Sequence, residues 1–294
     1  MSAIKEQKPS WKKIVEISAV TFVLVFGIFF IGTMAFWRLN EWLESLEIGE
    51  GSLQVIIYLE HLSYAVIMVL YALAVKPDRK YFIEPFKGDT RKHLFYGVIG
   101  LIAGFVMNAA CVLPAVWSGT LTLEPAAVVN VPVIIAALFA VYIQSSVEEF
   151  GFRAFMFGKS RDEGVPVWIA VLVSSFAFMF LHSANPGFGF LPMLELVTSA
   201  IFLAVSYHVF GSIWFACSMH MAWNFTQDFI FGLPNSGMPS ACSIFVSAQN
   251  TENLFFFDEA FGVEGTGMAV IVDLVGVAVI LLVGMLMNKK RENA

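Results

Sequence analysis

The sequence has few charged residues and few cysteines. Charged residues make up only 14% of the 294 residues, whereas hydrophobic residues make up 58%. Soluble domains carry roughly 25% charged residues, so this shortage excludes an ordinary soluble protein and indicates an integral membrane protein. The three cysteines, Cys111, Cys217 and Cys242, are far apart and form no CxxC pair. Their spacing excludes a disulfide framework and a cysteine-based zinc site.

Long stretches rich in glycine, serine or proline are also missing, so nothing divides the chain into units. We therefore predict a single membrane domain over residues 1–294, with an all-α fold built as a polytopic transmembrane helix bundle. The apolar run at 14–37 is too long for the apolar region of a signal peptide, and we interpret it as a retained first span.

Eight apolar segments approach the length of about 20 residues that a membrane-spanning helix needs. They are residues 14–37, 53–75, 93–117, 130–158, 166–183, 190–208, 211–231 and 267–288. Basic residues gather in 76–92, 159–161 and 289–291, while the long loop 232–266 contains no Lys or Arg. Because basic loops stay in the cytoplasm, about eight spans with both termini cytoplasmic fit this pattern, and seven or nine do not.

The fourth span carries three ionisable groups, Glu148, Glu149 and Arg153. One such charge at mid-membrane costs roughly 2.5–3.5 kcal/mol on insertion scales. Glu149 and Arg153 are four residues apart, so they share a helix face and can pair. Glu148 is rotated by about 100° from its neighbour and faces elsewhere. This arrangement predicts that Arg153 neutralises Glu149 and that Glu148 remains free to act in catalysis. The alternative is that all three residues form an ion-pair cluster that holds the bundle together.

Two of the five histidines favour the chemical interpretation. His182 ends the motif FMFLH in the fifth span, and His220 begins HMAWN in the seventh, with Asn224 on the same helix face. At about 1.5 Å per residue from the basic side, Glu148, His220 and Asn224 lie about 13–19 Å deep. His182 lies deeper, at about 25 Å by the same measure.

A carboxylate, two imidazoles and a carboxamide suffice for hydrolysis of an amide by water. Glu148 and His182 would deprotonate the water, and His220 and Asn224 would donate hydrogen bonds to the oxyanion. No serine or cysteine lies in a comparable set, which argues against a covalent nucleophile. Glu148, His182 and His220 could alternatively hold zinc with an open position, although no HExxH motif is present.

These segments resemble the CAAX-protease and bacteriocin-processing family (CPBP, or Abi) of intramembrane glutamic endopeptidases, which includes type II CAAX prenyl endopeptidases. The family pattern is EExxxR, FxxxH and HxxxN or HxxxD on separate helices, and all three occur here in that order, at 148–153, 178–182 and 220–224. The resemblance covers residues 130–230, the predicted catalytic core. Ala154 departs from the glycine that often follows the family arginine, which affects local geometry more than chemistry.

The resemblance implies that Glu148 and His182 activate water, that His220 and Asn224 form the oxyanion site, and that Glu149 and Arg153 support the site or bind substrate. It implies no cofactor, with zinc as the alternative because the family was long regarded as metal-dependent. The expected partners are a peptide or membrane-anchored protein substrate and the lipid bilayer, with no nucleic acid. Bacterial relatives process bacteriocins and other peptides, so we expect a multi-pass protein of a bacterial plasma membrane.

Two other functions compete with an endopeptidase that cuts from the cytoplasmic side. One is a non-catalytic scaffold or bacteriocin self-immunity protein that binds a peptide in the same pocket. The other is a transporter, although the two halves show no internal repeat of the kind transporters often have. The sequence identifies neither the substrate nor the oligomeric state.

The remaining polar residues of the spans are predicted to be structural. Glu60 and His61 are expected to pair across helices, Asn108 and Gln144 to form interhelical hydrogen bonds, and Asp273 to lie near the outer surface. Asp228, one turn from Asn224, is expected near the outer surface too, with a part in the network of the site as the alternative. The segment NLFFFDEAF, residues 253–261, is expected to rest on lipid headgroups or to re-enter the membrane.

Overall fold

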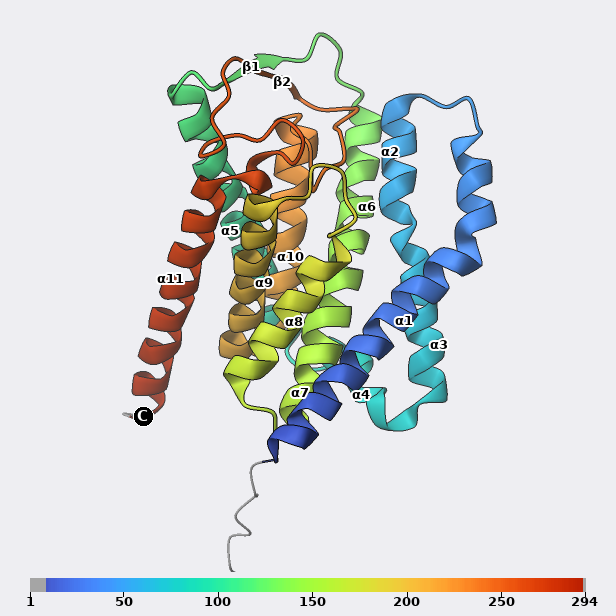
Figure 1. The fold of residues 1–294 in the computed structure, drawn as a ribbon, viewed down its shortest axis with the longest axis vertical. Coiled ribbons are helices and arrows are strands. Elements are labelled where there is room, and N and C mark those ends of the chain that lie inside the picture. Colours follow the sequence, from blue (N-terminus) through green and yellow to red (C-terminus); the bar gives the residue numbers. More distant parts are fainter. Residues whose placement is uncertain (1–8, 293–294) are drawn as a thin grey trace, which may run out of the picture.

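The computed structural model describes residues 9–292, which form a bundle of helices with a small sheet and long loops at one end (Figure 1). The α-helices are α1 (Trp11–Glu44), α2 (Glu50–Leu59), α3 (His61–Ala74), α4 (Lys80–Ile83), α5 (Thr90–Trp117), α6 (Val131–Glu149), α7 (Gly158–Asp162), α8 (Val167–Leu181), α9 (Phe190–Phe210), α10 (Ile213–Phe225) and α11 (Gly267–Glu292). Strands β1 (Leu121–Pro125) and β2 (Phe245–Gln249) pair antiparallel, from Leu121 opposite Gln249 to Pro125 opposite Phe245. The predicted all-α bundle is confirmed, and the small sheet is an unpredicted addition to it.

Each of the eight predicted apolar segments is helical. Within residues 9–292, six helical segments are long and apolar enough to cross a membrane. Helix α8 is apolar but has only 15 residues, and α10 has 13 residues before it continues as a π-helix at Thr226–Ile230. The chain is therefore a multi-pass membrane protein, and eight crossings remain a prediction.

The two ends of the bundle differ in charge. Figure 1 shows the start of α1, the end of α11, α4 and α7 together at one end, which we call the basic end. The sheet, the start of α2 and the 232–266 loop lie at the opposite end, which we call the loop end. The basic segments 76–92 and 159–161 fall at the basic end, and the loop without Lys or Arg falls at the loop end.

Two glycines allow α5 to pack closely against α10, the helix that carries HMAWN. A Cβ atom at Gly100 would lie 2.5 Å from the carbonyl oxygen of Phe215, and one at Gly104 would lie 2.3 Å from that of Met219. Such small residues let helix backbones approach inside membranes. This contact fixes the position of α10 in the centre of the bundle, where every residue from Phe215 to Asn224 is buried.

Helical irregularities occur beside the motif residues. Helix α6 ends at Glu149 and continues as a π-helix over Phe150–Phe157, and α10 changes to a π-helix soon after Asn224. Helices α2 and α3 meet at Glu60. Single π turns inside α-helices are frequent at functional sites, so these changes mark the same part of the molecule as the sequence motifs do.

The structure buries two aspartates, and part of one aromatic segment, that the sequence placed near the outer surface. Asp228 and Asp273 are buried, with 1% and 0% exposure, because other helices and the loop cover them. In the segment 253–261, Phe257 and Phe261 are buried in the protein core, whereas Phe255 is exposed. The segment therefore packs partly into the bundle. The two buried cysteines, Cys111 and Cys217, are core residues as predicted.

Candidate active site

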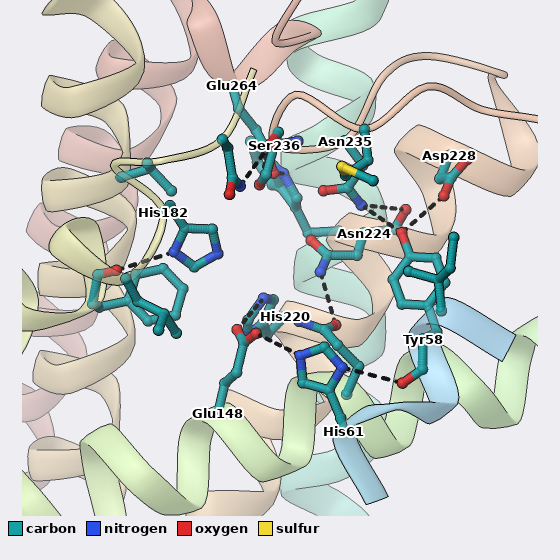
Figure 2. A pocket seen from close by; sticks show the side chains of 18 of the residues that line it. Tyr58, His61, Glu148, His182, His220, Asn224, Asp228, Asn235, Ser236 and Glu264 are labelled. Atoms are coloured by element: carbon teal, nitrogen blue, oxygen red, sulfur yellow. Dashed lines mark hydrogen bonds and ion pairs between the residues drawn. The ribbon is translucent and has the colours of Figure 1, made fainter. Parts of the chain in front are cut away.

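The three motifs meet at one cavity of about 780 Å³. Glu148 from α6, His182 from the end of α8, and His220 and Asn224 from α10 all line it (Figure 2). Glu149 and Arg153 are not among its lining residues. The four predicted catalytic residues thus line the same cavity, whereas the two predicted supporting residues lie outside its lining.

Glu149 and Arg153 form the predicted pair, with Arg153 Nη1 3.0 Å from Glu149 Oε1. Both side chains are fully buried. Arg153 also donates from Nη2 to the carbonyl oxygen of Ala200 on α9, at 3.3 Å, and its guanidinium lies 4.6 Å from the ring centre of Phe178. The arginine therefore links α6 to α8 and α9, which favours the supporting role over substrate binding.

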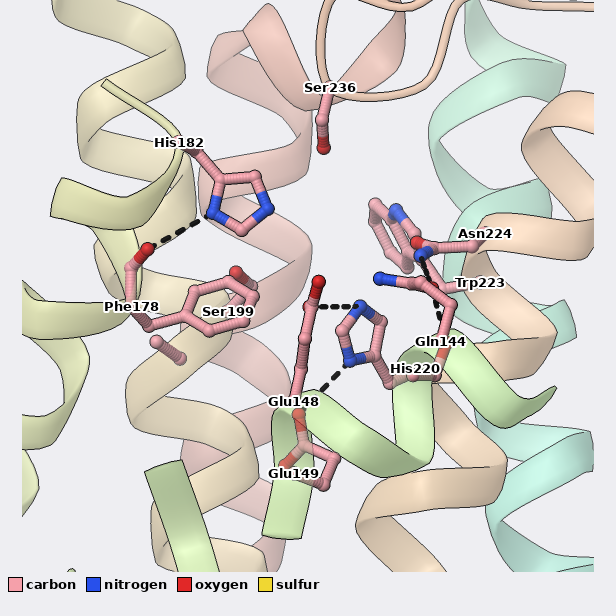
Figure 3. A network of polar contacts seen from close by, with 12 residues as sticks. Gln144, Glu148, Glu149, Phe178, His182, Ser199, His220, Trp223, Asn224 and Ser236 are labelled. Atoms are coloured by element: carbon pink, nitrogen blue, oxygen red, sulfur yellow. Dashed lines mark hydrogen bonds and ion pairs between the residues drawn. The ribbon is translucent and has the colours of Figure 1, made fainter. Parts of the chain in front are cut away.

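His220 bridges the two glutamates. Its Nδ1 lies 3.0 Å from Glu149 Oε1, and its Nε2 lies 3.8 Å from Glu148 Oε2 (Figure 3). The Glu148 side chain is nearly buried, and its Oε2 has no hydrogen-bond partner among the described protein atoms. A buried carboxylate oxygen without a partner costs free energy, so this atom is a natural position for binding water inside the cavity.

The orientation of His182 is fixed by its own helix. Its Nδ1 lies 3.0 Å from the carbonyl oxygen of Phe178, and a carbonyl can only accept, so Nδ1 carries the proton and donates. The other ring nitrogen, Nε2, faces the cavity in Figure 3 and is an acceptor in the neutral tautomer that donates from Nδ1. Among the described residues, His182 makes no direct ion pair with Glu148. It lies nearer the loop end than Glu148 (Figure 3), as its greater predicted depth indicated.

Asn224 is held by the fourth span. Its Nδ2 donates to Gln144 Oε1 at 3.2 Å, which confirms the interhelical hydrogen bond predicted for Gln144. The one predicted for Asn108 is confirmed too, because its Nδ2 donates to Gln227 Oε1 at 3.0 Å. The carboxamide of Asn224 has two N–H donors, and one is engaged with Gln144. Its second donor is the one available to an oxyanion.

His61 belongs to the site, although it lies outside the three motifs and was predicted to be structural. Its Nε2 lies 3.3 Å from Glu148 Oε1 and its Nδ1 lies 3.2 Å from the carbonyl oxygen of Tyr58 (Figure 2). It does pair across helices, but with the glutamate of the first motif. Both ring nitrogens face oxygens, and the Nε2 contact joins His61 to Glu148. In the sequence, only the adjacent ionisable residues Glu60 and His61 pointed to a role for this histidine. That adjacency did not indicate which helix His61 would face.

A loop closes the cavity at the loop end, and we call residues 234–241 the roof loop. Within residues 9–292, Ser236 is the one residue other than glycine with a positive φ, at 49°. Its N–H and hydroxyl both donate to Glu264 Oε2, at 2.6 and 2.7 Å, and its carbonyl accepts from Asn185 at 2.8 Å. Glu264 also accepts from Trp223 Nε1 at 3.0 Å. Strained backbone of this kind persists only where its surroundings hold it, so the roof loop is fixed directly above the motif residues.

Asp228 anchors the other side of the roof loop. Its carboxylate accepts from Gln54 Nε2 at 2.7 Å and from the Tyr58 hydroxyl at 2.8 Å, and its carbonyl accepts from Ser240 at 2.8 Å. Gln54 in turn accepts from the N–H of Ala241 at 3.0 Å. Helix α2, the end of α10 and the roof loop are therefore joined by one network through Asp228, which the sequence had as an alternative to a position near the outer surface.

The donors present do not form a metal site. Among the residues that the structure describes, no three His, Cys, Asp or Glu side chains converge as metal ligands do. Glu148, His182 and His220, the set predicted for zinc, line the same cavity but are not gathered around one point, because His182 and Glu148 lack a direct contact. The observed arrangement therefore does not fit zinc.

Comparison with known proteins agrees with the motifs. The model of the family described as type II CAAX prenyl endopeptidase Rce1-like matches residues 130–226. No curated protein matches the chain. The matched region contains Glu148, His182, His220 and Asn224, and it leaves out α1 to α5, the roof loop and α11. Residues 130–226 are therefore similar to the Rce1-like type II CAAX prenyl endopeptidase family, which is a family of proteases, in agreement with the resemblance carried by the motifs.

Proposed function

We propose that the protein is an intramembrane endopeptidase that hydrolyses peptide bonds with a water molecule activated by Glu148 and His182. The observation that carries the proposal is that Glu148 Oε2, which has no hydrogen-bond partner among the described residues, lies beside the cavity into which Nε2 of His182 is directed. A water hydrogen-bonded between these two atoms would have a proton acceptor on each side. General base catalysis of this kind contributes about 10²–10⁴-fold to a rate.

In the proposed reaction, the water oxygen attacks the carbonyl carbon of the scissile bond while His182 or Glu148 takes its proton. The resulting oxyanion accepts hydrogen bonds from Asn224 Nδ2 and from His220, if its Nε2 carries a proton. The proton then passes to the amide nitrogen, the carbon–nitrogen bond breaks, and a carboxylic acid and an amine leave. Donors fixed before the reaction begins cost no reorganisation as the charge develops.

Glu149 and Arg153 act as positioning residues in this proposal. Glu149 accepts from both Arg153 and Nδ1 of His220, so the ring of His220 cannot turn without losing a buried charged hydrogen bond. Such bonds are worth about 1.5–3 kcal/mol. The ion pair thereby keeps Nε2 of His220 directed at Glu148 and the cavity.

The test is a peptide-cleavage assay with the purified full-length chain in lipid nanodiscs. Glu148→Gln should lower kcat by at least about 10²-fold, because the amide cannot accept the proton. Glu163→Gln, an exposed glutamate at the basic end, is the matched control and should leave the rate unchanged. Equal rates for wild type and Glu148→Gln would refute the proposal, and peptide binding without cleavage would instead support a scaffold. A strong chelator is expected to leave the rate unchanged.

A further inference from the structure

A second, smaller cavity of about 260 Å³ lies at the basic end of the bundle. Its walls come from α4 and the turn that follows it, from α5 and α7, and from the junction of α9 with α10. Among the described residues, none lines both this cavity and the one that holds the motif residues. Pockets that enclose drug-sized ligands measure roughly 300–1,000 Å³, so this cavity suits one small chemical group.

Helix α10 begins in this cavity, because residues 211–214 are among those that line it. The first N–H groups of an α-helix have no partner within the helix, and together with the helix dipole they attract anions. Ser212 occupies the N-cap position, where a serine side chain usually accepts from one of these groups. Its side chain makes no such capping hydrogen bond. The start of α10 therefore presents backbone donors that its own cap residue does not occupy.

The hydroxyl of Ser212 indicates separately that a partner belongs in the cavity. The residue is buried, with 7% exposure, and its Oγ has no hydrogen-bond partner among the described residues. A buried polar group left unpaired costs free energy. Because Ser212 lines the cavity, an oxygen of a ligand bound there would accept a hydrogen bond from this hydroxyl and remove that cost.

Basic side chains complete the wall opposite the start of α10. Lys87 and His93 both line the cavity, and Lys87 forms no ion pair with a described residue. The ring of His93 lies 5.7 Å from that of Trp214, whose Nε1 donates to the carbonyl oxygen of Pro85 at 3.1 Å. These contacts fasten the basic segment to the first turn of α10, so the donors of both elements face a common space.

Two carboxylates also line the cavity, and one of them is already neutralised. Asp162 forms an ion pair with Lys80, and it accepts from the Tyr81 hydroxyl at 3.1 Å. Glu84 is the one other carboxylate in the described lining, and it is exposed to solvent, where water and salt screen its charge. The unpaired Lys87 and the positive end of the α10 dipole therefore make the cavity favourable for an anion.

Exposed apolar residues beside the cavity indicate that it lies at the membrane surface. Ile83 and Phe86 are 42% and 61% exposed, and they flank the charged residues of the same segment. Trp214 and Tyr81, which line the cavity, are of the two residue types enriched where membrane meets water. Basic residues next to exposed apolar ones are typical of a segment in the headgroup layer. Phosphate groups are the abundant anions of that layer.

From these observations we propose that this cavity binds a phosphate group, held by the Ser212 hydroxyl, the first N–H groups of α10 and the Lys87 ammonium. The group is either the phosphate ester of a lipid headgroup or a free phosphate, since both present the same oxygens. The site is separate from the proposed peptide cleavage and does not depend on it. Ser212 lies about 12 Å along α10 from His220, so a bound phosphate would fix the start of the helix that carries HMAWN.

Thermal unfolding of the purified full-length chain in dodecyl maltoside tests the site. A ligand that binds only the folded chain raises Tm. Phosphatidylglycerol should raise it by roughly 2–4 °C, whereas a glucosyl diacylglycerol with the same acyl chains and no phosphate should not. A rise with inorganic phosphate, compared with sodium chloride at equal ionic strength, would show that the free anion suffices. A rise with phosphatidylglycerol alone would identify a lipid headgroup. No rise with either, or an equal rise with the glucosyl lipid, would overturn the proposal.

Variants locate the bound phosphate within the molecule. Ser212→Ala should raise the ligand concentration for half of the Tm rise at least about tenfold, the effect of losing a hydrogen bond to a charged group. Lys87→Gln should raise it about two- to fivefold, and Glu84→Gln should lower it about twofold. Lys76→Gln, an exposed lysine of the same segment outside the lining, is the matched control. An unchanged response in both Ser212→Ala and Lys87→Gln would overturn the proposal, and Lys87→Gln decides alone if Ser212→Ala does not fold.

Discussion

Nε2 of His61 lies 3.3 Å from Oε1 of Glu148, so a histidine outside the three motifs contacts the proposed catalytic carboxylate. Its Nδ1 is directed at the carbonyl oxygen of Tyr58, so the ring is held from both sides. This contact engages Oε1 of the carboxylate, and under the proposed function Oε2 is the oxygen that binds water.

Removing this histidine should lower activity without unfolding the chain. We expect His61→Ala to reduce kcat by about 10–100-fold, since Glu148 loses the side chain that contacts and orients it. KM should change little, and the measurement is steady-state kinetics in nanodiscs. His93→Ala, at the basic end, is the matched control. If His61→Ala cleaves as fast as His93→Ala, the histidine has no part in the reaction.

The hydrogen bond from Asn224 to Gln144 leads to a graded prediction. Asn224→Ala should lower kcat by about 10²–10³-fold, the usual effect of losing one oxyanion donor. Gln144→Ala should have a smaller effect, because the carboxamide remains but is no longer oriented by the 3.2 Å bond. A larger loss for Gln144→Ala than for Asn224→Ala would show that Asn224 is not the donor.

The buried pair of Glu149 and Arg153 should be sensitive to removal of one partner. Arg153→Met leaves Glu149 with only His220 as a charged partner, and breaking a buried pair costs about 3–5 kcal/mol. Thermal unfolding in detergent should therefore show a marked fall in Tm. The double variant Arg153→Met with Glu149→Gln should recover part of it, and a double variant less stable than the single one would contradict a pairing role.

Helix packing at Gly104 can be tested against a glycine with open surroundings. Gly104→Ala would place a Cβ atom 2.3 Å from the carbonyl oxygen of Met219, and the resulting displacement should cost about 1–3 kcal/mol. Gly27→Ala in α1 has nothing within 4 Å of its Cβ and should be neutral or slightly stabilising. Similar Tm values for the two variants would mean that α5 and α10 do not depend on this contact.

The roof loop should make stability depend on pH. Burial raises the pKa of Glu264, although hydrogen bonds from Ser236 and Trp223 oppose the shift. The folded chain then keeps a proton at a pH where the unfolded carboxyl has lost it, so this group makes stability fall as the pH rises through that range. Glu264→Gln cannot titrate, and its Tm should decrease less than that of wild type between about pH 5 and pH 8. If Tm depends on pH in the same way in wild type and in Glu264→Gln, Glu264 is not the cause of the pH dependence.

The sequence predicted the parts of the site that depend on local spacing. Glu149 and Arg153 pair because four residues make one helical turn, and the same spacing places His220 and Asn224 on one face of α10. Helix positions followed from apolar length alone. These features need no knowledge of which helices are neighbours.

The missed parts depend on contacts between distant segments. His61 reaches Glu148 only because α3 lies beside α6, and Ser236 is held by Glu264 from a later turn of the chain. Asp228 and Asp273 were predicted to lie near the outer surface because their depth was counted along a single helix. Their burial comes from neighbouring helices and from the roof loop, which no count along one segment reveals.

The pairing of β1 with β2 has a consequence for how a long polypeptide is handled. The strand after the roof loop is hydrogen-bonded to the strand that follows α5, and the loop itself is tied to α2 and to Glu264. The covering chain is thus fastened at both sides, so it cannot swing away as a free flap. Under the proposed function, we therefore expect a substrate to thread beneath it as an extended strand, with folded domains kept outside.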